Sequence, residues 1–284
     1  HGDDHHDDLD PAEWERLNKF FAPPALDNDA KRASLARKDL QNLLQKNPAF
    51  KTWMDKNTAA HFHDHYKIAI ISLKPAGGIP GDATAEQMHG VAALAEQYGF
   101  GEIRVTHKQN LVIPHLHIGD LYALWERLVA LDLAHANFQQ LPDMIACPGM
   151  DYCTLANARS IPLAQQISTE LTNRTEALGM ISINISGCIN ACGHHHVGNI
   201  GILGVDRKGE EYYQITVGGR SDEQANIGKI VGPAFAYDQL CGAIGCIIDT
   251  YLAERAHDQE TFIAYIERAG IATLKEQLYA NNHA

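Results

Sequence analysis

The chain has 284 residues, a formal net charge of −12 and 45% hydrophobic residues, which is the composition of a globular protein with one large or two modest domains. The negative charge argues against a nucleic-acid partner, and no apolar run is long enough to cross a bilayer, so we expect no membrane contact. The chain begins at His1 with neither an initiator Met nor a signal-peptide pattern, which predicts a cytoplasmic protein that lacks an N-terminal part.

Residues 1–60 are polar and predict a partly helical linker, with one helix from Asp29 to Gln45. The segment from His1 to Asp8 is rich in His and Asp. These residue types bind metals, but a solvated linker explains them better.

Residues 61–136 predict a ferredoxin-like half-domain. Isoleucine-rich residues from Tyr66 to Lys74 predict a strand, and Thr84 with Gln87 forms a capping box that begins a helix ending at Gly99. Two further strands and a helix with period-3.6 leucines are expected over residues 102–106, 111–114 and 121–131. The order β-α-β-β-α is that of the ferredoxin-like fold, which serves many functions.

Four of the six cysteines form two close pairs. Cys147 and Cys153 have a C-x5-C spacing, and Cys188 and Cys192 have a C-x3-C spacing. Four thiolates in two tight loops predict an iron–sulfur cluster. A structural zinc site is the alternative, and the C-x5-C spacing argues against it because paired zinc ligands usually lie in turns with about two to four intervening residues.

The elements around these cysteines predict a mixed α/β domain over residues 137–284. A helix is expected from Thr154 to Leu171, with its first N–H groups directed at the anionic cluster. A strand from Ile181 to Ser186 leads into the second cysteine pair, a hairpin follows over residues 199–217, and the rest is mostly helical. The fold class is therefore α+β.

The segment from Asn184 to Gly193, with Cys-Pro upstream, resembles the signature of the sirohaem-dependent nitrite and sulfite reductases. The resemblance covers residues 66–280 and implies the C-terminal half of such an enzyme, in which the mixed domain holds a 4Fe–4S cluster and part of the sirohaem site. It implies that the two cysteine pairs ligate the cluster. It also implies that Cys192 bridges to the sirohaem iron, which makes it the catalytic residue.

Residues beside the second pair carry further expectations. Gly187 and Gly193 permit the close backbone approach that cluster loops need. Asn190 matches an asparagine of the family signature and is expected in the sirohaem pocket, an ordinary turn being the alternative. His194, the first of three consecutive histidines, is a candidate sirohaem contact or proton relay, although a structural role is favoured for any single one of them. Cys241 and Cys246 lie among small apolar residues and are expected in the core.

The resemblance also implies what the chain lacks. Residues 104–110 resemble a segment that occurs in both halves of these enzymes, and the copy that contacts sirohaem belongs to the first half, so Arg104 and Lys108 are not assigned to catalysis. Sirohaem and its substrate are anions that need converging cations. Few cations are available between Asn137 and Leu240: Arg159, Arg174, Arg207, Lys208, Arg220 and Lys229. We therefore expect a missing N-terminal half or a companion subunit, without which the chain is inactive.

The implied activity is the six-electron reduction of sulfite to sulfide or of nitrite to ammonia, with assimilatory sulfite reduction preferred. The chain has no dinucleotide fingerprint, so a separate ferredoxin or flavoprotein is the expected electron donor. The main alternative is an iron–sulfur electron-transfer subunit without sirohaem. A zinc-stabilised interaction domain is the third possibility.

Overall fold

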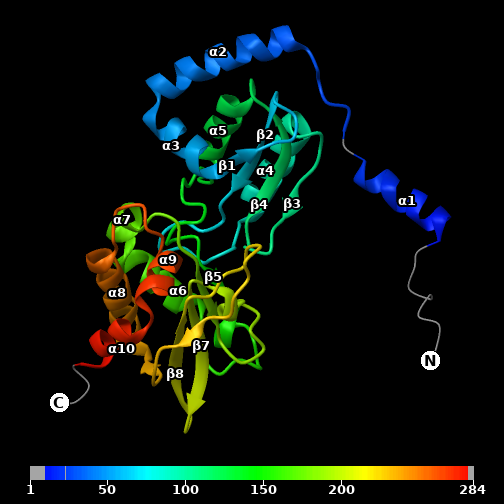
Figure 1. The fold of residues 1–284 in the computed structure, drawn as a ribbon. Helices are drawn as coiled ribbons and strands as arrows, with labels where there is room; N and C mark the ends of the chain where they lie inside the picture. The colour runs from blue at the N-terminus through cyan, green and yellow to red at the C-terminus, as the bar shows by residue number, and fades with distance from the viewer. Residues whose placement is uncertain (1–9, 23, 281–284) are drawn as a thin grey trace.

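The computed structural model describes residues 10–22 and 24–280. The segment His1–Asp8, considered above as a metal site or linker, lies outside the described residues. Two β-sheets, each with its own hydrophobic core, form the body of the molecule (Figure 1). None of the helices in these described ranges is long and apolar enough to span a membrane.

Three helices precede the first sheet. Helix α1 (Pro11–Phe21) lies apart from both sheets in Figure 1, whereas α2 (Ala30–Lys46) confirms the predicted helix and begins at the side-chain cap of Asp29. Helix α3 (Pro48–Asn57) buries Phe50 and Trp53 completely in the first core. Residues assigned above to a linker thus contribute to the first core.

The first sheet has the order β1-β2-β4-β3 and is antiparallel. Its strands and covering helices are β1 (Thr58–Ala60), β2 (Tyr66–Ile71), α4 (Ala85–Tyr98), β3 (Arg104–Val105), β4 (Leu111–His117) and α5 (Leu121–Ala130). The capping box of Thr84 and Gln87 is confirmed. Strand β4 runs past Pro114, where we expected it to end, because the pairing shifts register beside Pro114 and no ladder bond needs its missing N–H.

The second sheet has the order β10-β8-β7-β6-β5 and is mixed. Its strands are β5 (Ile145–Ala146), β6 (Ile183–Ser186), β7 (Ile200–Arg207), β8 (Glu210–Val217), β9 (Lys229–Ile230, paired with β8) and β10 (Phe235–Ala236). Strands β5, β6 and β7 are parallel, and β7 with β8 forms the predicted hairpin. The α+β class is confirmed.

Helices pack beside this second sheet: α6 (Ile161–Glu170), α7 (Thr175–Leu178), α8 (Tyr237–Glu254), α9 (Phe262–Ala269) and α10 (Ala272–Tyr279). Cys241 on α8 is buried as predicted, and Cys246 is half-buried. The helix predicted from Thr154 was wrong at its start. It begins at Ile161, because the N–H groups of Asn157 and Ala158 donate to the carbonyl of Gly187 instead of entering a helix.

Candidate cluster site

Two adjacent parallel strands deliver the two cysteine pairs to one edge of the second sheet. Ile145 and Ala146 of β5 pair with Asn184 and Ile185 of β6. Each pair of cysteines begins within two residues of the end of its strand. The carboxyl ends of neighbouring parallel strands lie at the same edge, which is where open sheets commonly bind ligands.

The first loop folds tightly between Cys147 and Cys153. Residues Gly149–Asp151 form a 3-10 turn, and the Cys153 N–H donates to the Gly149 carbonyl at 2.9 Å. Gly149 has φ +62°, and a Cβ there would lie 2.5 Å from the backbone nitrogen of Ser160. The loop therefore requires glycine, and it leaves Cys147 buried and Cys153 half-buried.

The second loop turns sharply through Cys188 and Cys192. A Cβ on Gly193 would lie 1.9 Å from the Ile185 carbonyl oxygen, and a Cβ on Gly187 would lie 2.6 Å from the Ala158 carbonyl oxygen. Both glycines are buried at close backbone contacts, whereas Asn190 and Cys192 are exposed. The thiol of Cys192 is thus accessible to a group outside this chain.

The sulfur of Cys147 has two polar neighbours. The Gly187 N–H donates to Sγ at 3.1 Å, and the Ser160 hydroxyl lies 3.3 Å from Sγ. Ser160 is the residue before α6, and its side chain faces this sulfur rather than capping the helix. Donors around a thiolate stabilise its charge and adjust the electronics of the metal it binds.

Cysteine ligands of a 4Fe–4S cluster each bind a different iron, so they surround a cube rather than converge on one ion. Among the described residues, no three His, Cys, Asp or Glu side chains are placed to hold a single metal ion. Donor chemistry, loop spacing and shared edge all fit a cluster.

The three consecutive histidines, 194–196, differ in exposure and in the groups around them. His194 has φ +56°, accepts a hydrogen bond at its carbonyl from Asn184 Nδ2 (2.9 Å) and lines a cavity of about 470 Å³ with His107 and Lys108. None of the four cysteines lines that cavity. His195 is 2% exposed, and its burial lowers its pKa to about 4. Its ring centroid lies 3.9 Å from that of the exposed His196, and the two ring planes are tilted by 32°.

Three of the six cations between Asn137 and Leu240 are paired with carboxylates. Arg159 pairs with Glu211, Arg174 pairs with Asp249, and Arg220 pairs with Asp222 and Glu267. Among the described residues, Arg207, Lys208 and Lys229 have no ion-pair partner. This stretch of the chain therefore offers few free cations to an anionic cofactor.

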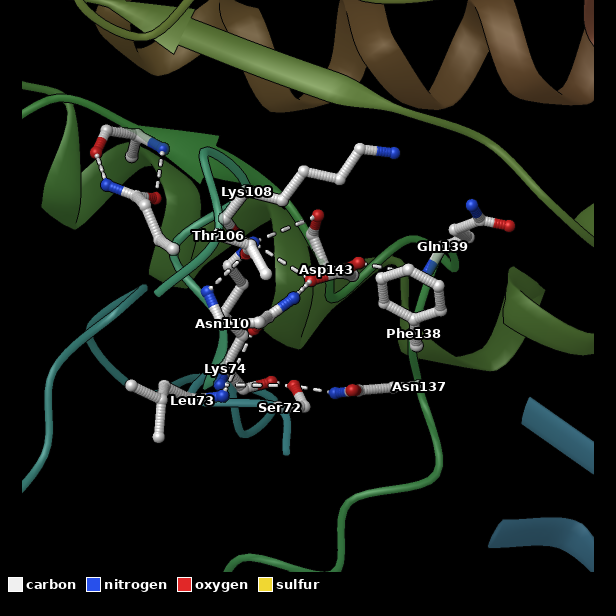
Figure 2. A network of polar contacts seen from close by, with 12 residues as sticks. Ser72, Leu73, Lys74, Thr106, Lys108, Asn110, Asn137, Phe138, Gln139 and Asp143 are labelled. Carbon is white, nitrogen blue, oxygen red and sulfur yellow. Dashed lines mark hydrogen bonds and ion pairs between the residues drawn. The ribbon is translucent and has the colours of Figure 1, made fainter. Parts of the chain in front are cut away.

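A buried polar network, which the sequence analysis missed, joins the two sheets (Figure 2). Lys74 and Asp143 form an ion pair at 2.9 Å with each side chain 1% exposed, and Asn110 Nδ2 donates to the same carboxylate oxygen at 2.8 Å. The Lys74 ammonium also donates to the Lys108 carbonyl. The sequence feature that could have indicated this network is the Gln109-Asn110 pair, which lies in the segment that occurs in both halves of the related enzymes.

The fold and the paired loops place the chain among α+β proteins that bring four cysteines to one sheet edge. Residues 73–131 match the model of the nitrite/sulfite reductase ferredoxin-like half domain, and residues 140–283 match that of the nitrite and sulphite reductase 4Fe-4S domain. The chain belongs to the nitrite and sulfite reductase family.

Named relatives include both kinds of reductase. The assimilatory ferredoxin-dependent nitrite reductase of Haloferax mediterranei is 29% identical over 67% of this chain and 33% of its own length. Sulfite reductase (ferredoxin) 1 of Mycolicibacterium paratuberculosis is 29% identical over 74% of this chain and 40% of its own. The structure of Mycobacterium tuberculosis NirA has a TM-score of 0.63 at 25% identity, covering 76% of this chain and 40% of NirA. The chain spans a third or less of the first curated relatives it matches.

Proposed function

We propose that this chain is the cluster-bearing C-terminal half of a reductase that converts sulfite to sulfide or nitrite to ammonia. The observation that carries the proposal is the delivery of both cysteine pairs to one edge by β5 and β6. Cys147, Cys153, Cys188 and Cys192 would hold the 4Fe–4S cluster, and Cys192 would bridge to sirohaem. When bound, the coupled cofactors supply single electrons to a bound anion.

The residues around the cysteines position hydrogen-bond donors and cofactor ligands. Gly187 and Ser160 place donors at the Cys147 sulfur, and the tight turn at Gly193 leaves Cys192 exposed for a shared ligand. Asn190, exposed beside Cys192, is proposed to line the sirohaem pocket. His194 lines a cavity bordered by residues beside both sheets. We propose that it contacts sirohaem in the complete protein.

Ligand assignment is tested by replacing each of the four cysteines with Ser in the chain purified and reconstituted without oxygen. We expect about four irons in the unmodified chain and loss of the cluster signal in each variant, since each thiolate binds one iron. Cys246→Ser is the matched control and should keep its iron. Iron retained by all four variants would refute the assignment, and zinc without iron would refute the cluster.

Catalysis is tested separately with sirohaem and a reduced viologen as donor. We expect no turnover of sulfite or nitrite by the chain alone, because Arg159, Arg174 and Arg220 are occupied by carboxylates. Turnover should appear when the remaining part of the reductase is supplied. Cluster bands without sirohaem bands in that complex would favour an electron-transfer subunit.

The relatives suggest an electron donor and two possible substrates, which we propose for this chain. The nitrite and sulfite reductases named above both carry ferredoxin in their names, so we propose ferredoxin as the donor and a flavoprotein as the competitor. Relatives of both kinds are 29% identical to the chain, which does not support the preference for sulfite. Steady-state kinetics of the complete enzyme with each anion would decide between them.

A further inference from the structure

Gln109 occupies the free edge of β5. This strand is the last of its sheet, and within residues 10–22 and 24–280 it pairs with β6 alone. On its other side, Gln109 Nε2 donates to the Ala146 carbonyl at 2.8 Å, and the Ala146 N–H donates to Gln109 Oε1 at 3.2 Å. The carboxamide thus bonds Ala146 as a peptide group of a neighbouring strand would.

This contact lies one residue before Cys147. The Cys147 N–H donates to the Ile185 carbonyl at 3.1 Å, so Ala146 and Cys147 are held from opposite sides of β5. Fixing the backbone on both sides of one peptide bond fixes the direction in which the Cys147 side chain leaves the strand.

Gln109 is itself held firmly in the half-domain. Its backbone has φ +57°, and its N–H donates to the Thr106 carbonyl at 3.1 Å. Gly81, with φ +80°, approaches so closely that a Cβ there would lie 2.9 Å from Gln109 Cβ. The next residue, Asn110, bonds the buried Asp143 (Figure 2). These contacts fix the backbone from which the Gln109 side chain reaches Ala146.

We propose that Gln109 is a positioning residue for Cys147, through which the ferredoxin-like half-domain sets the geometry of one cluster ligand. This inference rests on the proposed role of Cys147 as a ligand. The residue does not touch the sulfur; it acts through the backbone of Ala146.

The test compares Gln109→Met with Gln165→Met in the cluster-loaded chain. Gln165 is a matched control, because it is also half-buried and its Nε2 donates across the two units to the Gly77 carbonyl at 3.0 Å, away from the cysteines. We expect Gln109→Met to release iron to a chelator about tenfold faster, the effect of losing two hydrogen bonds. It should also change the electron paramagnetic resonance spectrum of the reduced cluster, whereas Gln165→Met leaves both unchanged.

Three outcomes would overturn the inference. The inference is wrong if Gln109→Met has the parental spectrum and the parental rate of iron release. It is also wrong if Gln109→Met and Gln165→Met accelerate iron release equally, because that would reflect weaker packing between the half-domain and the second sheet. A parental chain that binds no iron overturns the proposed function and this inference together. If Gln109→Met does not fold, Gln109→Glu retains the acceptor for the Ala146 N–H, and the same two measurements decide.

Discussion

At the scale of single residues, His195 is a neutral imidazole enclosed by protein. It is 2% exposed, and its Nδ1 has no hydrogen-bond partner among the described residues. Burial and the neighbouring His196 lower its pKa from 6.5 to about 4. Between these values the unfolded chain binds a proton that the folded chain does not, so stability should fall as the pH falls from 6.5 towards 4.

Replacing His195 with Gln should flatten this dependence. We expect the unfolding free energy of the parental chain, measured with urea at steps between about pH 7 and pH 4, to drop more steeply than that of His195→Gln. His89→Gln is the control, because that residue is exposed on α4, is not in contact with His195, and should leave the slope in place. Parallel curves for the parental chain and His195→Gln would contradict the argument.

At the scale of elements, backbone contacts at glycine define the second cysteine loop. The Ile185 carbonyl that a Cβ on Gly193 would strike also accepts the Cys147 N–H, so it cannot move without breaking the link between β5 and the loop. We expect Gly193→Ala to lower the unfolding free energy by about 3 kcal/mol or more. Chemical denaturation measures this loss, and iron content should fall with it.

Gly242 in α8 provides the opposite case. A Cβ there meets no atom within 4 Å, and glycine is unfavourable inside a helix. Gly242→Ala should therefore raise the unfolding free energy by about 0.5–1 kcal/mol. Equal losses from the two Gly→Ala changes would show that alanine at these sites acts through something other than the close contact at Gly193.

At the scale of the whole molecule, a buried ion pair between Lys74 and Asp143 links the two sheets. Burial lowers the pKa of Lys74, and Asp143 opposes that shift by pairing with the ammonium. Lys74→Met leaves the Asp143 carboxylate buried without its counter-ion, so we expect a loss of about 3–5 kcal/mol in unfolding free energy. Denaturation followed by fluorescence and circular dichroism measures it.

The exposed pair of Lys51 and Asp55 is the matched control, since their side chains are 58% and 59% exposed. Lys51→Met should cost less than about 0.5 kcal/mol because water screens the pair. A similar small cost at Lys74 would mean that the network in Figure 2 does not hold the two sheets together.

Local patterns predicted most elements well. Thr84 with Gln87, the helix beginning at Asp29 and the hairpin of β7 and β8 were confirmed, because caps and periodicity depend on residues a few positions apart. The helix expected from Thr154 was wrong at its start because Gly187, far along the chain, competes for the N–H groups of that segment.

The sequence by itself determined the family signature, the four candidate ligands and the α+β class, since spacing and hydrophobic pattern are local properties of the chain. Only the tertiary structure decided that Gln109 meets Ala146 and that Lys74 meets Asp143. Those partners are separated by 37 and 69 positions, and the residue types alone do not specify which distant group satisfies a buried amide or ammonium. The folded arrangement of the two sheets makes that choice.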